Sequence, residues 1–578
     1  MAKSDNVRRK GGPGVDPHTK TMAGLLFGSI LLGLLVASSL KLTAKRYGLS
    51  DDISLNPIVL AVGIVTKSYT WNTYTTLAFC AQIVIIAVLV GSCWWAVAKL
   101  SPKSAKRVDE VQHLMGSQRD RDSFSKAAVT ELAKKWLPPA LATQKPGLQF
   151  GCEVGNRKKG LWSSWEDLYL IIFGPRMGKT TTQVIPAIVD APGVVMTTSN
   201  KRDIVDETIG VTGARGRAFV FDPQRIAAGF EQLRWFFDPL DALREDGDLM
   251  DSKALALADI FLCAQGGDTS SGDSYFRNAG RDLVSRLFMA AALGNLSITE
   301  VFTWASDDSD RTPVGILLAH EEWKQHGQAL AATYGITERT RSGIFSQAAQ
   351  MVAPLGRREA AKWITPTASA QRFSPADFVR SQADTLYILS KEGPDSAAAL
   401  TTALVAAVTQ AAERYGEECG GRLPVPLVAA LDEAANTVRW PELPQLYSHY
   451  GSRSIILMTI LQSYAQGVSV WGEEGMEALW SASAIMMYGG GVRDEKMLQK
   501  MSELIGEAEE STTSVSRSQG GRSLSTSTHE KKILTVSELS ALEAGRAIVF
   551  ATKRRPIIAE LIPWWERNWP KEIKDNLG

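Results

Sequence analysis

Cysteine is scarce and widely spaced in this sequence. Its five cysteines among 578 residues include no Cys-x-x-Cys pair, which argues against a zinc site or a disulfide framework and fits a reducing compartment. Excess charge is also absent, because 63 Lys and Arg residues offset 62 Asp and Glu residues to leave a formal net charge of +1. This balance excludes a globally basic nucleic-acid coat, although local basic patches remain compatible with it.

Charge is missing altogether from two long runs near the N-terminus. After a polar, basic tail at 1–21, which we expect to be disordered and cytoplasmic, residues 22–40 contain no charge and are long enough to span a bilayer. Residues 76–98 form a second such run, which contains Trp94 and Trp95 near its end. A secretory signal and a buried core helix are the competing interpretations. We expect two transmembrane helices joined by an extracytoplasmic loop at 41–75.

The central stretch of the chain is an apolar run that ends in a glycine-containing turn. Residues 168–173 are followed by Gly-Pro-Arg-Met-Gly-Lys-Thr-Thr, the order of a strand, a phosphate-binding turn and a helix N-terminus. The common pattern G-x-x-x-x-G-K-[ST] places its first glycine at Phe173, whereas here the glycine comes one position later. A surface turn with a lone lysine is the alternative. The residues expected to contact nucleotide are Gly174, Pro175, Arg176, Met177, Gly178, Lys179, Thr180 and Thr181.

These residues predict specific roles. Lys179 would reach the β- and γ-phosphates, and the hydroxyl of Thr180 would coordinate Mg²⁺. A second apolar run, 425–431, ends in Asp432-Glu433; we assign Asp432 to the metal and Glu433 to general base for the attacking water. An acidic loop after a strand is the alternative. The two motifs together predict ATP hydrolysis with ATP and Mg²⁺.

Further apolar runs indicate more strands of the same sheet. They cover 193–198, 218–221, 384–389 and 454–460, alternating with helical stretches, and predict an α/β fold with a mostly parallel, doubly wound sheet. Gln462 follows the last of these runs and would sense the γ-phosphate, although a structural glutamine is nearly as good an interpretation.

About 250 residues separate the two nucleotide motifs, and the region between them is rich in helical signals. We therefore expect an all-α domain inserted into the sheet domain. The remaining boundaries follow from composition and place a membrane-proximal helical stem before the nucleotide-binding domain, which the insertion divides. The predicted division is 99–147 for the stem, 148–245 and 371–578 for the nucleotide-binding domain, and 246–370 for the insertion.

The segments around the sheet also carry predictions. Residues 148–164 suggest a short hairpin, and 547–551 a last strand before the chain closes with three tryptophans. The Ser- and Thr-rich run at 511–528 has the composition of a flexible loop. Its two arginines could contact DNA phosphates, but a solvated loop is the favoured interpretation.

The motifs resemble those of the type IV secretion coupling proteins, the membrane-anchored ATPases of bacterial conjugation. No single string is decisive, and the resemblance rests on their order and spacing, together with the two-span anchor. The chain departs from the family at Phe173, and at Asp238 where the family often has Asn. The motifs are Gly-Pro-Arg-x-Gly-Lys-Thr at 174–180, Thr-Ser-Asn-Lys-Arg-Asp at 198–203, Phe-Asp-Pro at 221–223, Asp-Pro-Leu at 238–240, Leu-Asp-Glu-Ala-Ala-Asn at 431–436, Leu-Gln-Ser at 461–463, Leu-Thr-x-x-Glu-Leu at 534–539 and Pro556.

The resemblance carries implications for assembly and partners. It implies a RecA-like hexameric ring with nucleotide between subunits, and a trans-acting arginine for which Arg453 fits best and Arg493 is the runner-up. It also implies a multi-pass protein of the bacterial plasma membrane, largely cytoplasmic, because the ATP site needs cytoplasmic ATP. Such a protein receives a relaxase–DNA complex and passes single-stranded DNA into a type IV secretion channel. The helical insertion would recognise partners.

Two other functions are compatible with the sequence. One is a double-stranded DNA translocase of the chromosome-partitioning type, which shares the ring ATPase core. That family has more spans and a C-terminal winged helix, for which this chain has too few residues after the final predicted strand. The other is a membrane adaptor for secreted proteins that uses ATP only as a switch, although Glu433 beside Asp432 argues against it.

Overall fold

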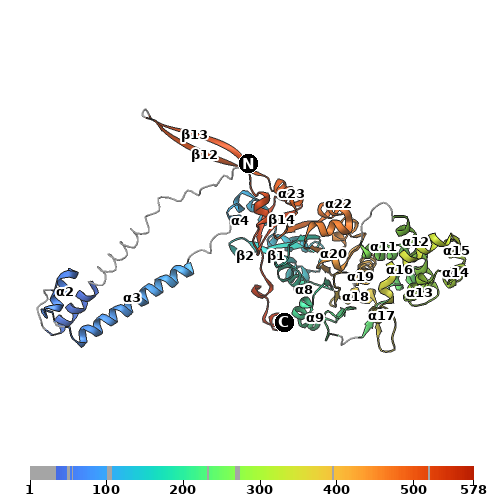
Figure 1. Ribbon diagram of the computed structural model, residues 1–578, viewed down its shortest axis with the longest axis horizontal. Coiled ribbons are helices and arrows are strands. Elements are labelled where there is room, and N and C mark those ends of the chain that lie inside the picture. The colour runs from blue at the N-terminus through green and yellow to red at the C-terminus, as the bar shows by residue number, and fades with distance from the viewer. Residues whose placement is uncertain are drawn as a thin grey trace. The chain divides into compact units, whose positions relative to one another are not determined.

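The computed structural model divides into two compact units, Met1–Ala105 and Lys106–Gly578, and each is described by itself (Figure 1). The tail predicted at 1–21 and most of the first predicted span lie outside the described residues. The structure describes residues 34–47, 53–54, 56–69, 71–100, 107–230, 234–266, 274–393, 396–518 and 521–578.

The first unit is helical. Residues 34–47 form a helix, α2 (Pro57–Val65) lies within the predicted extracytoplasmic loop, and α3 (Thr73–Leu100) contains the whole second predicted span. Within the described ranges, α3 has the one stretch long and apolar enough to cross a membrane, Thr73–Ser92. The hydroxyl of Ser38 donates to Gln82 of α3 at 2.9 Å, so the helix at 34–47 packs against α3.

An eleven-stranded sheet organises the second unit. The seven strands from β11 to β5 are parallel, and the four on the other side of β11 pair antiparallel. The apolar runs form these strands because the sheet is covered on both faces. In sheet order the strands are β2 (Asn156–Ser164), β1 (Gly147–Glu153), β15 (Ile557–Glu560), β14 (Arg546–Ala551), β11 (Ile485–Tyr488), β3 (Tyr169–Ile172), β10 (Ile455–Leu461), β9 (Leu427–Leu431), β4 (Val195–Ser199), β8 (Thr385–Leu389) and β5 (Ala218–Phe221).

Helices cover both faces of this sheet. Ile171 of β3 packs in one buried cluster with Ile188 of α8 and Ile204 of α9, whereas Leu170, on the opposite face, packs in another with Leu404 of α19. Successive residues of a strand point to opposite faces, which produces the two clusters. The helices around the sheet are α8 (Ile185–Asp190), α9 (Asp203–Arg215), α18 (Pro375–Arg380), α19 (Ala398–Glu418), α20 (Ala434–Thr437), α21 (Leu443–Leu446), α22 (Tyr464–Ala482), α23 (Glu495–Ile505), α24 (Val536–Ser540) and α25 (Lys571–Lys574).

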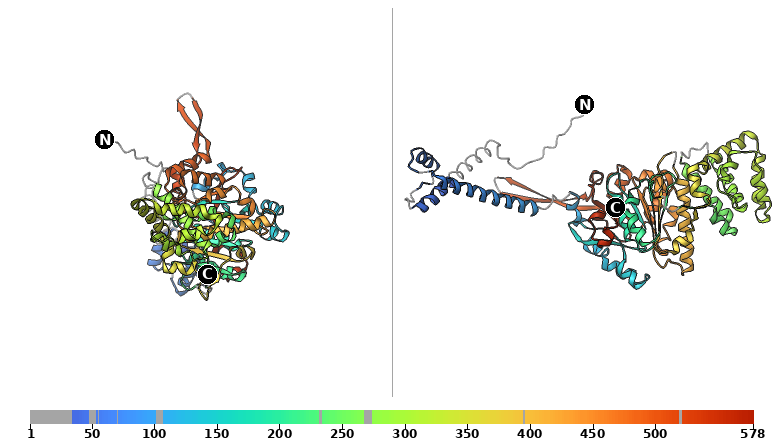
Figure 2. Two further views of the ribbon diagram at one scale, coloured as in Figure 1. Left: turned by 90° about the vertical axis from the view of Figure 1, so that its right-hand side faces the viewer. Right: turned by 90° about the horizontal axis from the view of Figure 1, so that it is seen from below.

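The predicted all-α insertion is present between two short strands that pair in parallel, β6 (Trp235–Phe236) and β7 (Gln371–Arg372). Figure 2 shows its helices as a group beyond the sheet. The structure gives a reason for Asp238, one of the two departures from the family pattern. Its carboxylate forms ion pairs with Arg244 at 2.7 Å and with Arg372 at 3.4 Å. A neutral Asn could not form these ion pairs. The insertion contains α10 (Asp241–Glu245), α11 (Met250–Gln265), α12 (Ser274–Leu293), α13 (Glu300–Ser306), α14 (Thr312–Leu318), α15 (Lys324–Gly335), α16 (Glu338–Val352) and α17 (Arg358–Ile364).

Three peripheral segments differ from their predictions. The predicted flexible loop at 511–528 belongs to a two-stranded antiparallel hairpin, β12 (Glu507–Ser518) with β13 (Gly521–Lys532), because the backbone pairs regardless of the Ser- and Thr-rich composition. The strand at 546–551 is not the last, since β15 follows and pairs with both β14 and β1.

By contrast, the predicted hairpin at 148–164 is confirmed as β1 and β2.

The third segment is the predicted stem. Its described part contains short helices, and Val108 and Met115 are buried in the main core. The amide of Gly116 donates to the carbonyl of Pro556 at 2.8 Å, so this segment packs on the nucleotide-binding body from residue 107 onward. Its helices are α4 (Arg107–Glu110), α5 (Gln118–Asp122), α6 (Lys126–Ala133) and α7 (Pro139–Gln144).

Packing of α19 against the sheet yields a stability prediction. Leu404 is fully buried, so Leu404→Ala should lower the free energy of unfolding by about 2–5 kcal/mol through lost burial and a residual cavity. Chemical denaturation of the full chain measures this change. Leu504→Ala, at a side chain that is 49% exposed, is the matched control and should change stability by less than about 0.5 kcal/mol. Equal effects of the two substitutions would contradict the packing described here.

Candidate active site

The phosphate-binding turn follows β3, the central strand of the eleven-stranded sheet. Gly178 has φ +83° and Arg176 has φ +61°, both in the left-handed region that glycine adopts at little cost and other residues adopt rarely. Lys179 precedes a π-helical turn, Thr180–Val184, which continues into α8. The turn therefore delivers Lys179 and Thr180 at the start of a helix, as the sequence predicts.

The structure explains why the first glycine comes one residue late. Phe173 is fully buried and its amide donates to Leu461 of β10 at 3.1 Å, so this position still belongs to the core. Gly174 makes the close approach instead: its amide donates to the carbonyl of Gly490 at 2.9 Å. A Cβ on Gly174 would lie 2.2 Å from the carbonyl oxygen of Gly491. The small residue is therefore required at 174.

The acidic pair meets the loop from β9. The ammonium of Lys179 donates to the carboxylate of Glu433 and lies 4.0 Å from Asp432. The hydroxyl of Thr180 donates to Asp432 Oδ2 at 3.1 Å. From the end of β10, the side-chain amide of Gln462 donates through Nε2 to Glu433 Oε1 at 2.6 Å. The five residues to which the sequence assigns metal or catalytic roles near the phosphates therefore converge at the C-terminal ends of β3, β9 and β10.

Burial sets the electrostatics of this cluster. Asp432 and Glu433 are each 3% exposed. Burial raises the pKa of Asp432 to about 6, although the ammonium of Lys179 acts in the opposite direction. Glu433 adopts φ +54°, a strained conformation of the kind that concentrates at functional sites. Its Oε2 is buried, with no hydrogen-bond partner among the described residues.

These residues fit a magnesium–nucleotide complex. Mg²⁺ prefers hard oxygen ligands. The Thr180 hydroxyl and the Asp432 carboxylate offer two such oxygens, 3.1 Å from each other. Glu433 Oε2, without a partner among the described residues, is an acceptor available to a water molecule, as the role of general base requires.

The two candidate arginines are placed differently. Arg453 precedes β10 and pairs with Glu413 and Glu417 of α19 at 2.5 and 3.1 Å. Because β10 runs parallel to β3, Arg453 lies at the N-terminal ends of these strands. The phosphate-binding turn of the same chain lies at their C-terminal ends. Arg493 is exposed and follows the glycines that contact Gly174. The structure thus brings the Arg493 segment, and not Arg453, to the site within one chain.

Sequence reasoning missed the contribution of Gly489–Gly491. A Cβ on Gly490 would lie 2.9 Å from the Met177 side chain and 2.6 Å from the carbonyl oxygen of Leu542. The signal was present, because three consecutive glycines follow an apolar run at 485–488, the pattern of a strand that ends at a close backbone approach.

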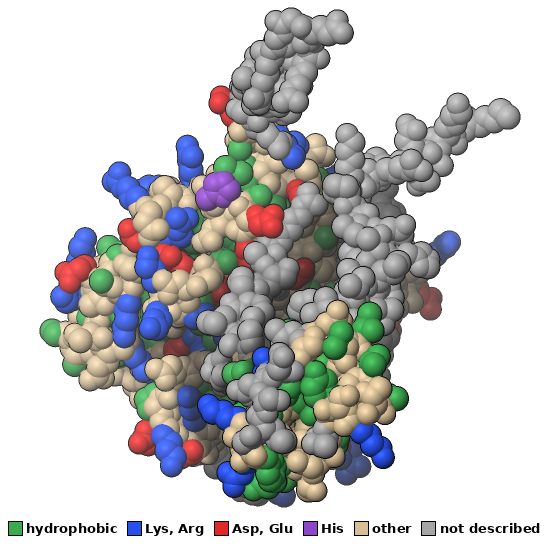
Figure 3. Space-filling model, turned by 90° about the vertical axis from the view of Figure 1, so that its left-hand side faces the viewer, with side chains coloured by type: hydrophobic (Ala, Val, Ile, Leu, Met, Phe, Trp, Pro, Cys, Tyr) green, Lys and Arg blue, Asp and Glu red, His purple; other side chains and the backbone are tan. Residues whose placement is uncertain are grey.

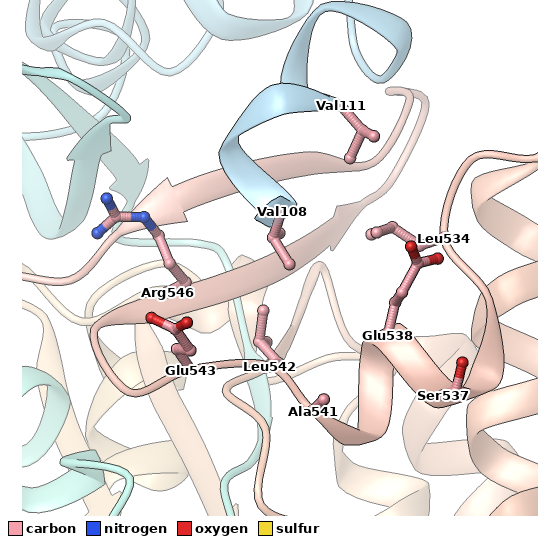
Figure 4. A pocket seen from close by; sticks show the side chains of 9 residues that line it. All are labelled: Val108, Val111, Leu534, Ser537, Glu538, Ala541, Leu542, Glu543 and Arg546. Carbon is pink, nitrogen blue, oxygen red and sulfur yellow. The ribbon is translucent and has the colours of Figure 1, made fainter. Parts of the chain in front are cut away.

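A cavity of about 230 Å³ lies beside this contact region. Figure 4 shows Leu542, Leu534 and Val108 along the cavity, with Glu543 and Arg546 near each other at the left of the view. The neighbouring α24 begins with a capping box, in which Thr535 and Glu538 satisfy each other's backbone amides. The Leu-Thr-x-x-Glu-Leu motif at 534–539 is therefore a helix-start signal.

The backbone contact at Gly174 yields a prediction for binding. Gly174→Ala should weaken nucleotide binding by about tenfold or more, because the added methyl group must displace the Gly491 backbone. Equilibrium titration with a fluorescent ATP analogue measures the effect. Gly213→Ala on α9 is the control, since a Cβ there meets nothing within 4 Å, and it should bind like wild type. Unchanged binding by Gly174→Ala would show that the loop does not need this contact.

Comparisons with known proteins agree with the motifs. Residues 426–544 match the family described as the TraM recognition site of TraD and TraG. A search of curated proteins finds no match.

Solved structures of a conjugative coupling protein share the fold. The unbound monoclinic form of TrwBdeltaN70 has a TM-score of 0.52 at 18% identity, covering 76% of this chain and 91% of that one. Its trigonal form in complex with sulphate has a TM-score of 0.51 at 17% identity, covering 76% and 92%. TrwB in complex with ADP and Mg²⁺ has a TM-score of 0.51 at 18% identity, covering 71% and 87%. The resemblance to the type IV coupling proteins is confirmed, by the family match at 426–544 and by a fold shared over most of the chain.

Proposed function

We propose that this protein is the coupling ATPase of a conjugative type IV secretion system. The observation that carries the proposal is the convergence of Lys179, Glu433 and Gln462, with Thr180 and Asp432, at one edge of a parallel sheet. This set supplies a cation for phosphate, oxygen ligands for Mg²⁺ and a buried carboxylate for water activation. The fold that surrounds the set resembles that of the TrwB structures.

Each residue has a defined role in this proposal. Lys179 exchanges its contact with Glu433 for the phosphates, and Glu433 then orients a water molecule and accepts its proton. Thr180 and Asp432 would hold Mg²⁺, and the ion would supply charge neutralisation at the phosphates. Gln462, hydrogen-bonded to Glu433 at 2.6 Å, senses whether the γ-phosphate is present and transmits this state to β10.

The proposal extends to assembly and partners. We infer a hexamer in the bacterial inner membrane, anchored by two spans, of which Thr73–Ser92 is one candidate. The nucleotide-binding domain lies on both sides of the insertion, whose first helix, α10 (Asp241–Glu245), comes before the boundary at 246 expected from the sequence. The cargo is a relaxase with single-stranded DNA, delivered to the secretion channel. The match to a TraM recognition site at 426–544 supports this segment as a contact with relaxosome proteins, in addition to the insertion.

DNA contact in this proposal is local. The formal net charge is +1, and on the face drawn in Figure 3 basic side chains are interspersed with acidic and neutral ones. Binding would therefore rely on a limited number of phosphate contacts in the channel of a ring, and its affinity should fall steeply as salt concentration rises.

ATP hydrolysis by the full chain tests this function. Single-stranded DNA should stimulate the rate, and the stimulation should fall with increasing salt because counterion release contributes to binding. Lys179→Ala and Glu433→Gln should each abolish hydrolysis and plasmid transfer while leaving membrane insertion intact. Steady-state kinetics and a mating assay provide the measurements.

The control is Lys324→Ala, at an exposed lysine of the helical insertion that pairs with Glu321 three residues earlier. It should hydrolyse ATP like wild type. Wild-type transfer by Glu433→Gln would exclude a hydrolytic motor. Hydrolysis that does not respond to DNA would favour the adaptor function, and stimulation only by double-stranded DNA would favour the partitioning-type translocase.

Subunit mixing tests the trans-acting arginine. Arg453→Ala should be nearly as inactive as Lys179→Ala, and a mixture of the two variants should recover part of the activity if Arg453 acts across an interface, because some interfaces then combine two intact residues. ATPase assays of reassembled mixtures measure the recovery. The parallel mixture with Arg493→Ala is the comparison, and recovery in that mixture alone would assign the role to Arg493.

A further inference from the structure

A proline interrupts the helix that carries the nucleotide-binding residues. Pro186 is the second residue of α8 and has no N–H to donate to the carbonyl of Thr182, the partner it would have in a continuous α-helix. The preceding turn is widened accordingly, and the amide of Ile185 donates five residues back to Thr180. The Thr182 carbonyl therefore needs another donor.

Arg567, 385 residues further along the chain, supplies that donor. Its Nη2 donates to the carbonyl of Thr182 at 3.5 Å and to the carbonyl of Gln149 in β1 at 2.8 Å. Its Nη1 lies 3.3 Å from Asp190, the last residue of α8. The side chain is 4% exposed. One buried guanidinium thus contacts both ends of the helix that begins beside Lys179 and Thr180.

The C-terminal tail around Arg567 is fixed by further contacts. The indole of Trp569 donates to Asp190 at 2.8 Å, so this carboxylate has two donors from the tail. The tail then reaches α9, where the amide of Gly578 donates to the carbonyl of Glu207 at 3.2 Å. A Cβ on Gly210 would lie 2.4 Å from the carbonyl oxygen of Asn576, which requires glycine at this approach.

The surrounding charges agree with a structural cation at this point. Burial lowers the pKa of Arg567, whereas Asp190 raises it, and burial raises the pKa of Asp190 whereas Arg567 lowers it. A buried charge pair is stabilised by further hydrogen bonds to both partners. The carbonyls of Gln149 and Thr182 and the indole of Trp569 provide such bonds, whereas the Nε of Arg567 is buried without a partner among the described residues.

We propose that Arg567 is a positioning residue for the nucleotide site. By satisfying the carbonyl that Pro186 leaves without its helical donor, it holds the widened turn Thr180–Val184 against β1 and so sets the placement of Lys179 and Thr180. The side chain of Gln183 supports the same turn by donating to the carbonyl of Phe150 at 3.1 Å. Arg567, on the C-terminal tail, therefore acts on the nucleotide site through this turn. This inference rests on the proposed ATPase function.

Four variants of the full chain test this inference: Arg567→Ala and Arg567→Lys, each in the wild-type and Pro186→Ala backgrounds. Arg567→Ala should weaken Mg²⁺–ATP binding about tenfold, and Arg567→Lys should retain part of the affinity. Pro186→Ala supplies a backbone N–H that pairs with the Thr182 carbonyl when the turn adopts the α-helical register, so it should recover most of the affinity lost in either variant. Titration with a fluorescent ATP analogue gives Kd, and steady-state assays give kcat separately.

Trp565→Phe is the matched control, because this tryptophan lies on the same tail with its side chain 58% exposed, and it should bind like wild type. Wild-type affinity in Arg567→Ala would overturn the inference, and so would a loss that Pro186→Ala fails to repair. If thermal melts show that Arg567→Ala does not fold, the two Arg567→Lys variants decide by the same criteria. Absence of nucleotide binding by wild type would instead overturn the proposed function.

Discussion

The buried ion pair between Lys179 and Glu433 is the interaction on which the site depends. It joins the loops after β3 and β9, which are not neighbours in the sheet because β10 lies between them. Buried charges require additional hydrogen bonds, and Gln462 at the end of β10 supplies one at 2.6 Å. The strand order thus places a cation, a carboxylate and an amide from three segments in contact. A ligand that displaces Lys179 from Glu433 changes the surroundings of all three.

A backbone contact gives the same site a connection to the C-terminal half of the chain. Gly174 and Gly490 share a hydrogen bond of 2.9 Å, and Gly490 also approaches the carbonyl of Leu542. This series of contacts leads from the phosphate-binding turn to the cavity beside α24, a helix that lies within the residues that match the TraM recognition family.

The limits of sequence-based prediction follow from how each element is stabilised. Apolar runs predicted the parallel strands because they are buried on both faces. β15 was missed because its run is short and its partner β1 lies about 400 residues away. The hairpin at 507–532 has a linker-like composition, and only its backbone ladder identifies it. Arg453 was expected to act across an interface, which stays a prediction, and in one chain it pairs with α19.

The sequence by itself determined the chemistry: the lysine, hydroxyl and paired carboxylates at strand ends, the helical insertion and an apolar segment long enough to cross a membrane. These features depend on residue type and local spacing, which are visible in one dimension. The tertiary structure alone decided why Phe173 is compatible with the turn and why Arg567 contacts the helix after it. Both depend on backbone groups of distant segments, Gly491 for the turn and Thr182 for the helix. Such groups are the same in every residue, so no sequence pattern reveals which of them will meet.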